Sequence, residues 1–118
     1  MSFMLPADVN VYLYLSPCDM RKSINTLSIL VKDTLDKNPS SGHLFLFRSR
    51  DKSKMKALYF SDNCFSLWYR KLDKGRFIFP KGKDGCIELT RDHFQWLLVS
   101  HQYQHTDNLE PKQYNAFY

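Results

Sequence analysis

The stretch from His43 to Lys71, HLFLFRSRDKSKMKALYFSDNCFSLWYRK, decides the fold class of this 118-residue chain. Short runs of β-forming residues alternate here with polar turn signals such as Asp51-Lys52 and Ser61-Asp62-Asn63, and two similar runs follow. The five runs are 43–48, 54–61, 64–71, 76–80 and 86–89. Short strands separated by turns at regular spacing are typical of antiparallel sheets. The pattern predicts an antiparallel β-meander, in a protein with about five to six short strands.

Helical periodicity appears on both sides of this meander. Residues 10–15 read as a further strand, after which Ser16, followed by a proline and a carboxylate, makes a favourable helix start. Apolar residues at helical spacing predict an amphipathic helix over 17–36. Thr90 is placed to cap a second helix over 91–101. Strands and helices that are segregated in this way indicate an α+β fold.

Length and composition limit the class of protein. With 43% hydrophobic and 25% charged residues, the chain suits one globular domain, predicted over 1–101, with a polar tail over 102–118 that is mobile or docked. Its apolar runs are too short to cross a bilayer, and residues 1–6 lack the pattern of a secretory signal. Three cysteines without a CxxC spacing favour reduced thiols, so we expect a cytoplasmic protein.

Positive charge is concentrated in the middle of the chain. The net charge of the whole chain is +5, whereas residues 43–85 alone carry eleven basic and four acidic side chains, together with nine aromatic ones. Cations that neutralise phosphates, interleaved with rings that stack on bases, are typical of nucleic-acid surfaces. The alternative is that the aromatic residues form the core while the basic ones face solvent on the opposite sides of the strands.

Asp19-Met20-Arg21-Lys22 is an unusual sequence for the first turn of the helix predicted over 17–36. A helix N-terminus attracts anions, so Arg21 and Lys22 oppose the helix dipole there while strengthening a site for a phosphate. The alternative is structural, with Asp19 capping the helix and Arg21 bridging to a neighbouring strand.

Candidate catalytic and metal-binding groups have simpler explanations. Asp62, Asp73 and Asp84 are spaced like a carboxylate triad, but all three fall at predicted turns, where aspartate is favoured. His101, His105 and Asp107 could form a small metal site, but the sequence shows no further ligand near them. Two cysteines in apolar strands, Cys64 and Cys86, are expected to be buried filler rather than nucleophiles. Phosphate-binding, dinucleotide-binding and hydrolase motifs are absent from the sequence, so we predict no catalytic, cofactor or metal site.

Three segments resemble one protein family. They are Asp19-Met20-Arg21-Lys22, Ser41-Gly-His-Leu-Phe-Leu-Phe-Arg-Ser-Arg50 and Leu67-Trp-Tyr-Arg-Lys-Leu-Asp-Lys-Gly-Arg-Phe-Ile-Phe-Pro80. In this order they are similar to the small accessory proteins (TnpB-type, Orf2-like) of the insertion-sequence-66 (IS66) group of bacterial mobile elements. The resemblance spans about residues 5–100. This chain departs from it at 23–27, Ser-Ile-Asn-Thr-Leu, where relatives usually have Gly-Phe-Asp-Gly-Leu.

The resemblance implies a transposition accessory factor, encoded beside a DDE-type transposase that carries the catalytic carboxylates, and without an assigned activity of its own. We therefore expect a non-catalytic protein that binds DNA at the element ends and works with the transposase and another accessory protein. The predicted nucleic-acid-binding residues are Arg21, Lys22, Arg48, Arg50, Lys52, Lys54, Lys56, Arg70, Lys71, Lys74 and Arg76.

Two other functions remain open from the sequence. One is a protein–protein adaptor that docks on the transposase or another accessory subunit through exposed aromatic side chains such as Trp68 and Tyr69. The other, much weaker, is a small metal-dependent nuclease that uses Asp62. A continuous positive surface would favour DNA binding, whereas an exposed aromatic patch would favour the adaptor.

Overall fold

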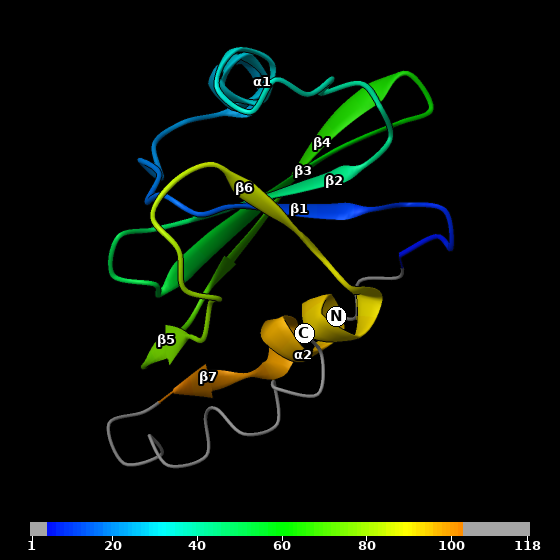
Figure 1. The fold of residues 1–118 in the computed structure, drawn as a ribbon. Helices are drawn as coiled ribbons and strands as arrows, with labels where there is room; N and C mark the ends of the chain where they lie inside the picture. Colours follow the sequence, from blue (N-terminus) through cyan, green and yellow to red (C-terminus); the bar gives the residue numbers. More distant parts are fainter. Residues whose placement is uncertain (1–4, 103–118) are drawn as a thin grey trace.

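A computed structural model describes residues 5–102 and confirms the predicted α+β class. A five-stranded, mostly antiparallel sheet in the order β4-β3-β2-β1-β6 carries α1 on one face and α2 on the other (Figure 1). A separate two-stranded sheet pairs β5 with β7. The elements are β1 (Val11–Tyr14), α1 (Ile24–Asp33), β2 (Leu44–Arg48), β3 (Lys54–Ser61), β4 (Cys64–Lys71), β5 (Arg76–Phe77), β6 (Cys86–Leu89), α2 (Arg91–Val99) and β7 (His101–Gln102).

The continuous meander is shorter than the sequence predicts. Strands β2, β3 and β4 follow one another as antiparallel neighbours, but β1 pairs parallel to β2 and antiparallel to β6. The run predicted as a strand over 76–80 leaves this sheet after β4, and only Arg76 and Phe77 are strand residues. Phe77 and Phe79 instead bury their rings in the core, which explains the apolar character that suggested a sheet strand.

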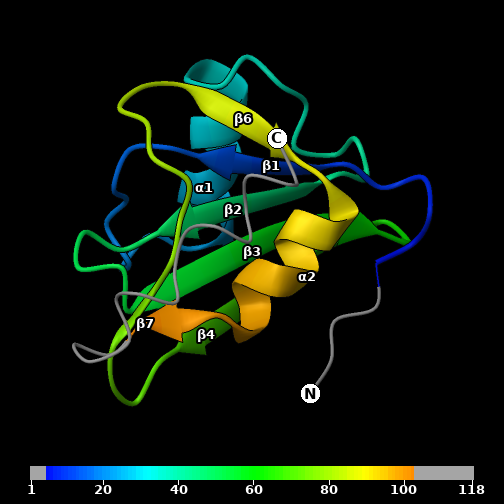
Figure 2. The same ribbon diagram turned by 60° about the horizontal axis from the view of Figure 1, so that its bottom comes forward.

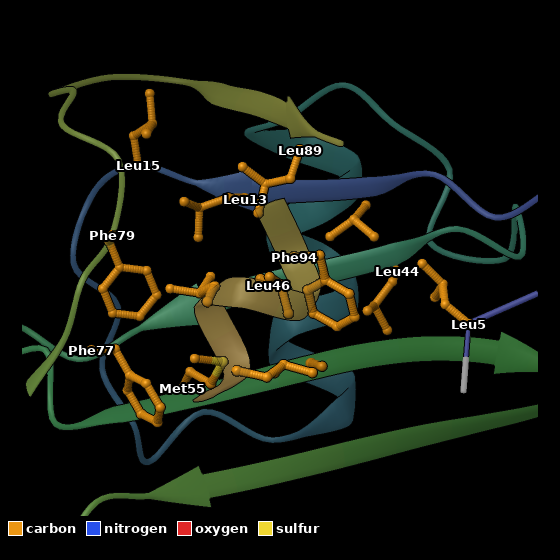
Figure 3. Close-up of a cluster of buried hydrophobic side chains, with 14 residues drawn as sticks. Leu5, Leu13, Leu15, Leu44, Leu46, Met55, Phe77, Phe79, Leu89 and Phe94 are labelled. Carbon is orange, nitrogen blue, oxygen red and sulfur yellow. The ribbon is translucent and has the colours of Figure 1, made fainter. Parts of the chain in front are cut away.

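Alternation along the strands divides the core between the two faces of the sheet. Leu44 and Leu46 contribute to the cluster on the α2 side, whereas Phe45 and Phe47 join the cluster on the α1 side. Figure 3 shows Phe94 of α2 among the strand leucines on its side of the sheet. All four β2 side chains from Leu44 to Phe47 are at most 1% exposed, because helices cover both faces of this central strand.

The first helix begins seven residues later than the sequence predicts, at Ile24 rather than residue 17, and ends at Asp33 rather than 36. Before it, the amide of Cys18 donates to the Arg48 carbonyl at 2.8 Å, which holds this segment against the end of β2. Asp19 to Lys22 form a turn, and Ser23 is the actual N-cap. Arg21 and Lys22 therefore do not lie in a first helical turn.

The second helix agrees better with the sequence. Thr90 is its N-cap, with the side-chain oxygen accepting from the His93 amide, and the helix ends at Val99. Residue 101, predicted as the last helical position, belongs to β7 instead. Most of the predicted tail, from residue 103 onward, lies outside the described residues. In the part of the chain that the structure describes, neither helix is long and apolar enough to span a membrane.

Candidate nucleic-acid interface

The sheet topology gathers the basic residues at one end of the molecule. Strands β1, β2 and β4 end at this end of the sheet, and β3 and β6 begin there. Figure 2 shows the connecting loops together on the left of the view. We call this region the basic end. Within residues 5–102, its thirteen cationic residues are Arg21, Lys22, Arg48, Arg50, Lys52, Lys54, Lys56, Arg70, Lys71, Lys74, Arg76, Lys81 and Lys83.

Backbone hydrogen bonds connect these loops directly. In the β2–β3 loop, the carbonyl of Ser53 accepts from the Leu72 amide at 2.9 Å, and the carbonyl of Lys52 accepts from the Phe77 amide at 2.7 Å. These bonds hold the segment that follows β4 against the hairpin that precedes β3. The eleven residues predicted to bind nucleic acid therefore lie at the same end of the fold, although they come from three separate parts of the sequence.

Asp51 lies in the middle of the β2–β3 loop, and its carboxylate stabilises the shape of that loop. Its Oδ1 accepts hydrogen bonds from the Ser49 hydroxyl at 2.7 Å, from the Ser53 hydroxyl at 2.8 Å and from the Ser53 amide at 3.0 Å. These hydrogen bonds, of which the one from the Ser49 hydroxyl has the largest effect, hold the pKa of the Asp51 carboxyl well below its ordinary value. The carboxylate thus shapes the loop that presents Arg50 and Lys52.

Two of the predicted phosphate-binding residues also have internal partners. Lys56 donates from Nζ to the carbonyl oxygens of Met20 at 2.7 Å and Lys22 at 2.8 Å. Arg48 donates from Nη2 to the Leu15 carbonyl at 3.0 Å, and burial, followed by repulsion from Arg50, lowers its pKa. Arg48 thus connects β2 to the end of β1, and Lys56 connects β3 to the turn before α1, so both side chains have a structural role.

The Asp19–Arg21 pair agrees only in part with the two interpretations of the sequence, which were a phosphate site at a helix N-terminus and a helix cap with a bridge to a neighbouring strand. The two side chains form an ion pair at 2.8 Å, but Arg21 bridges back to its own turn rather than to a neighbouring strand. The hydrogen bonds from the Arg21 side chain and amide lower the pKa of Asp19 to about 2. With 91% of its side chain exposed, Arg21 still presents its guanidinium to solvent.

Strands β3 and β4 place like charges opposite each other at the basic end. Lys54 is the cross-strand partner of Lys71, and the next pair on the same face is Lys56 with Tyr69. Directly opposed like charges destabilise a sheet unless a counter-charge is supplied. Tyr69 is 50% exposed, and its ring centroid lies 5.4 Å from the Lys56 Nζ.

The opposite face of β4 carries Trp68 and Arg70. Trp68 is half-buried and packs against the core cluster on the α2 side, so it is not an exposed anchor of the kind that an adaptor requires. Arg70 lies over the Trp68 ring at 5.7 Å from its centroid. Beyond β4, Lys74 is exposed in the connection to the second sheet, and Arg76 is exposed in β5.

The prediction of binding residues left out Lys81 and Lys83, which reach the basic end through the loop before β6. The Ser16 hydroxyl donates to the Lys83 carbonyl at 2.8 Å, and the Leu15 amide donates to the Gly85 carbonyl at 3.0 Å. The signal in the sequence was their membership of the same positively charged segment.

Negative charge lies mainly toward the opposite end. Among residues 5–102, four carboxylates accompany the thirteen cations of the basic end, namely Asp19, Asp51, Asp73 and Asp84, and of these Asp19 and Asp51 have local partners. Six acidic residues of the described chain lie toward the opposite end of the strands. They are Asp8, Asp33, Asp36, Asp62, Glu88 and Asp92. The charge of the fold is therefore polarised along the strands.

The other chemical candidates do not come together. Within residues 5–102, no three His, Cys, Asp or Glu side chains form a group that could hold a metal ion. Asp62 is in the β3–β4 turn with φ of 52°, as its turn role predicts. His105 and Asp107 lie outside the described residues. Cys64 is exposed, contrary to its expected burial, and Cys86 is half-buried.

The family described as IS66 Orf2-like protein matches residues 9–108, which includes every loop of the basic end and extends beyond the resemblance seen in the sequence. The chain belongs to the IS66 Orf2-like family. It is thus an IS66 Orf2-like transposition accessory protein.

Two relatives from Sinorhizobium fredii (strain NBRC 101917 / NGR234) are similar over most of their length. The chain is 32% identical over 104 residues to the protein named Uncharacterized protein y4hO, covering 86% of this chain and 90% of that one. It is 31% identical over 83 residues to Uncharacterized protein y4jC, covering 70% and 71% of the two chains. No solved structure matches the chain.

Proposed function

We propose that this IS66 Orf2-like protein is a non-catalytic accessory factor that binds DNA through its basic end and assists a separate transposase. The observation that carries the proposal is the polarised charge of residues 5–102: thirteen cations lie at one end of the sheet, accompanied by four carboxylates. Such a concentration of cations is complementary to a polyanion and releases counterions when it meets phosphates.

Several of these cations are available to a ligand. Arg50 and Lys74 are exposed, and neither makes an ion pair among residues 5–102. Lys54 and Lys71 face each other across the β3–β4 pair and would gain a shared counter-charge from a phosphate. Contacts of this kind position a protein on the nucleic-acid backbone without reading sequence. We therefore assign the basic end to phosphate contact rather than to recognition of bases.

The test is titration of a fluorescent DNA duplex with the full chain over a range of salt concentrations. The logarithm of the binding constant should fall with the logarithm of salt concentration, with a slope of about −0.9 per phosphate contacted. The double variant Arg50→Glu/Lys74→Glu should bind more weakly and reduce the slope by about two contacts. Lys32→Glu, a single charge reversal at an exposed site near the end of α1, is the control and should retain wild-type binding.

A flat salt dependence would contradict this proposal, and so would an equal loss of affinity in the Lys32→Glu variant. The adaptor alternative keeps one specific observation in its favour, which is the exposure of Tyr69 on the sheet. If the protein is an adaptor, transposase should be retained in a pull-down without DNA and lost with Tyr69→Ala, while Arg50→Glu/Lys74→Glu should leave the interaction intact.

A further inference from the structure

We propose that two copies of this chain associate through antiparallel pairing of their β4 strands, which joins the two five-stranded sheets into one. Strand β4 is at the edge of the sheet, with β3 on one side. In the described part of the chain, no strand pairs with its other side. An edge strand presents unpaired backbone donors and acceptors along its length, which makes it a template for another strand.

Strand β4 also lacks the features that commonly protect an edge. It has eight residues in unbroken register with β3, without a bulge or a proline, and its only charged residues are Arg70 and Lys71 at one end. The other edge strand, β6, is different: it has four residues and carries Glu88. Short length and charge are common protections of sheet edges, so β4 is the edge suited to pairing.

The β3–β4 turn determines which backbone groups face outward. Asp62 and Asn63 have φ of 52° and 61°, the pattern of a two-residue type I′ turn, which closes on a hydrogen-bonded pair, here Ser61 and Cys64. Hydrogen-bonded and non-hydrogen-bonded pairs then alternate along the ladder. The residues of β4 whose backbone N–H and C=O groups point away from β3 are therefore Phe65, Leu67, Tyr69 and Lys71.

The sequence of β4 favours one register with a second copy. Placing Leu67 opposite Leu67 on a two-fold axis pairs Phe65 with Tyr69 on both sides of it. The centre of the interface is then apolar on the α1 face, where Phe65 and Leu67 already extend the core cluster. Cys64 of each copy is brought opposite Arg70 of the other, and Lys71 falls beyond the paired apolar residues.

The charge distribution along β4 argues for a second copy in antiparallel orientation. Both cations of the strand lie at its C-terminal end, so antiparallel pairing places them at opposite ends of the interface. Parallel pairing would put Arg70 and Lys71 of the two copies next to each other, which like-charge repulsion disfavours. The strand is thus complementary to itself in only one direction.

Sedimentation equilibrium of the full chain tests the association. The wild type should have twice the mass of one 14.0 kDa chain at concentrations of tens of micromolar. Leu67→Lys, which sets two ammonium groups against each other on the axis, should give a monomer. Ile29→Lys is the control because Ile29 is 57% exposed on α1 and does not belong to β4, and this variant should remain a dimer. A monomeric wild type, or a dimer that persists in Leu67→Lys, would overturn the proposal.

Disulfide trapping tests the register and does not depend on how Leu67→Lys folds. Arg70→Cys should form an intermolecular disulfide with the native Cys64 of the other copy under mild oxidation, because directly opposed residues are about 4.5–5.5 Å apart at Cα. Within one chain, six residues along the strand separate the two positions by about 20 Å, which excludes an internal bond. Cross-linking should be lost in Arg70→Cys/Cys64→Ser and absent in Lys71→Cys. Equal cross-linking of Lys71→Cys, or none with Arg70→Cys, would reject this register.

Discussion

Lys56 donates from its ammonium nitrogen to the carbonyl oxygen of Met20 at 2.7 Å, across 36 positions of sequence. The same nitrogen also binds the carbonyl oxygen of Lys22. In a helix that began near residue 17, these two carbonyls would accept from amides four residues further on. In the structure Lys56 donates to both carbonyls, and the segment forms a turn against the sheet before α1 begins at Ile24. A strand lysine thus stabilises the turn that precedes the helix.

Replacing Lys56 with methionine should therefore lower stability more than its surface position suggests. The variant leaves two partly buried carbonyls without their donor, which costs about 1–3 kcal/mol of unfolding free energy. Urea denaturation monitored by circular dichroism measures this difference. Lys52→Met is the control, because the Lys52 side chain has no hydrogen-bond or ion-pair partner within residues 5–102, and should change stability by less than about 0.5 kcal/mol. Equal effects of the two variants would contradict the role of Lys56.

Lys54→Glu should raise stability while it weakens nucleic-acid binding. The variant replaces the repulsion between Lys54 and Lys71 with an attractive cross-strand pair, for a gain of about 0.2–1 kcal/mol. It also removes a cation from the proposed phosphate-binding surface. The two measurements, urea midpoint and duplex affinity, should therefore move in opposite directions. If the variant is less stable than the wild type and binds the duplex equally well, the pair of Lys54 and Lys71 neither destabilises the sheet nor contributes to DNA binding.

The Asp51 carboxylate should make the protein less stable in acid. Its pKa is lowered in the folded state by hydrogen bonds from Ser49 and Ser53, so the folded state holds the deprotonated form more strongly than the unfolded state does. The resulting stabilisation is present above the ordinary pKa of aspartate, about 3.9, and is lost as pH falls toward the folded-state value. Asp51→Asn should be less stable at neutral pH and show a shallower decline below about pH 5. Parallel pH profiles for the two proteins would contradict this account.

Asn63→Val should destabilise the β3–β4 hairpin. Asn63 has φ of 61°, a conformation that asparagine tolerates and that β-branched residues strongly disfavour. The expected cost is about 1–3 kcal/mol of unfolding free energy, read from the urea midpoint. Asn63→Gly, which accepts positive φ without strain, should keep near wild-type stability. If valine is tolerated as well as glycine, the turn does not require the left-handed conformation.

The sequence was sufficient for the elements whose signals are local. Runs of β-forming residues between turn signals identified β3 and β4, Thr90 identified the start of α2, and Asp62-Asn63 identified the tight turn. Each of these depends on side-chain periodicity or on the backbone preference of one or two residues. The positive segment was also visible in the sequence, because charge is counted directly from residue types.

Tertiary structure decided the features that depend on distant partners. The pairing of β1 between β2 and β6, the departure of Phe77 and Phe79 into the core and the late start of α1 all arise from contacts across many residues. The same applies to the basic end, where Arg21, Lys74 and Lys83 come from loops that only the order of the strands brings together. Periodicity specifies which face of a strand is buried, but it carries no information on which strand lies beside it, so the side on which the cations meet was settled by packing of the whole chain.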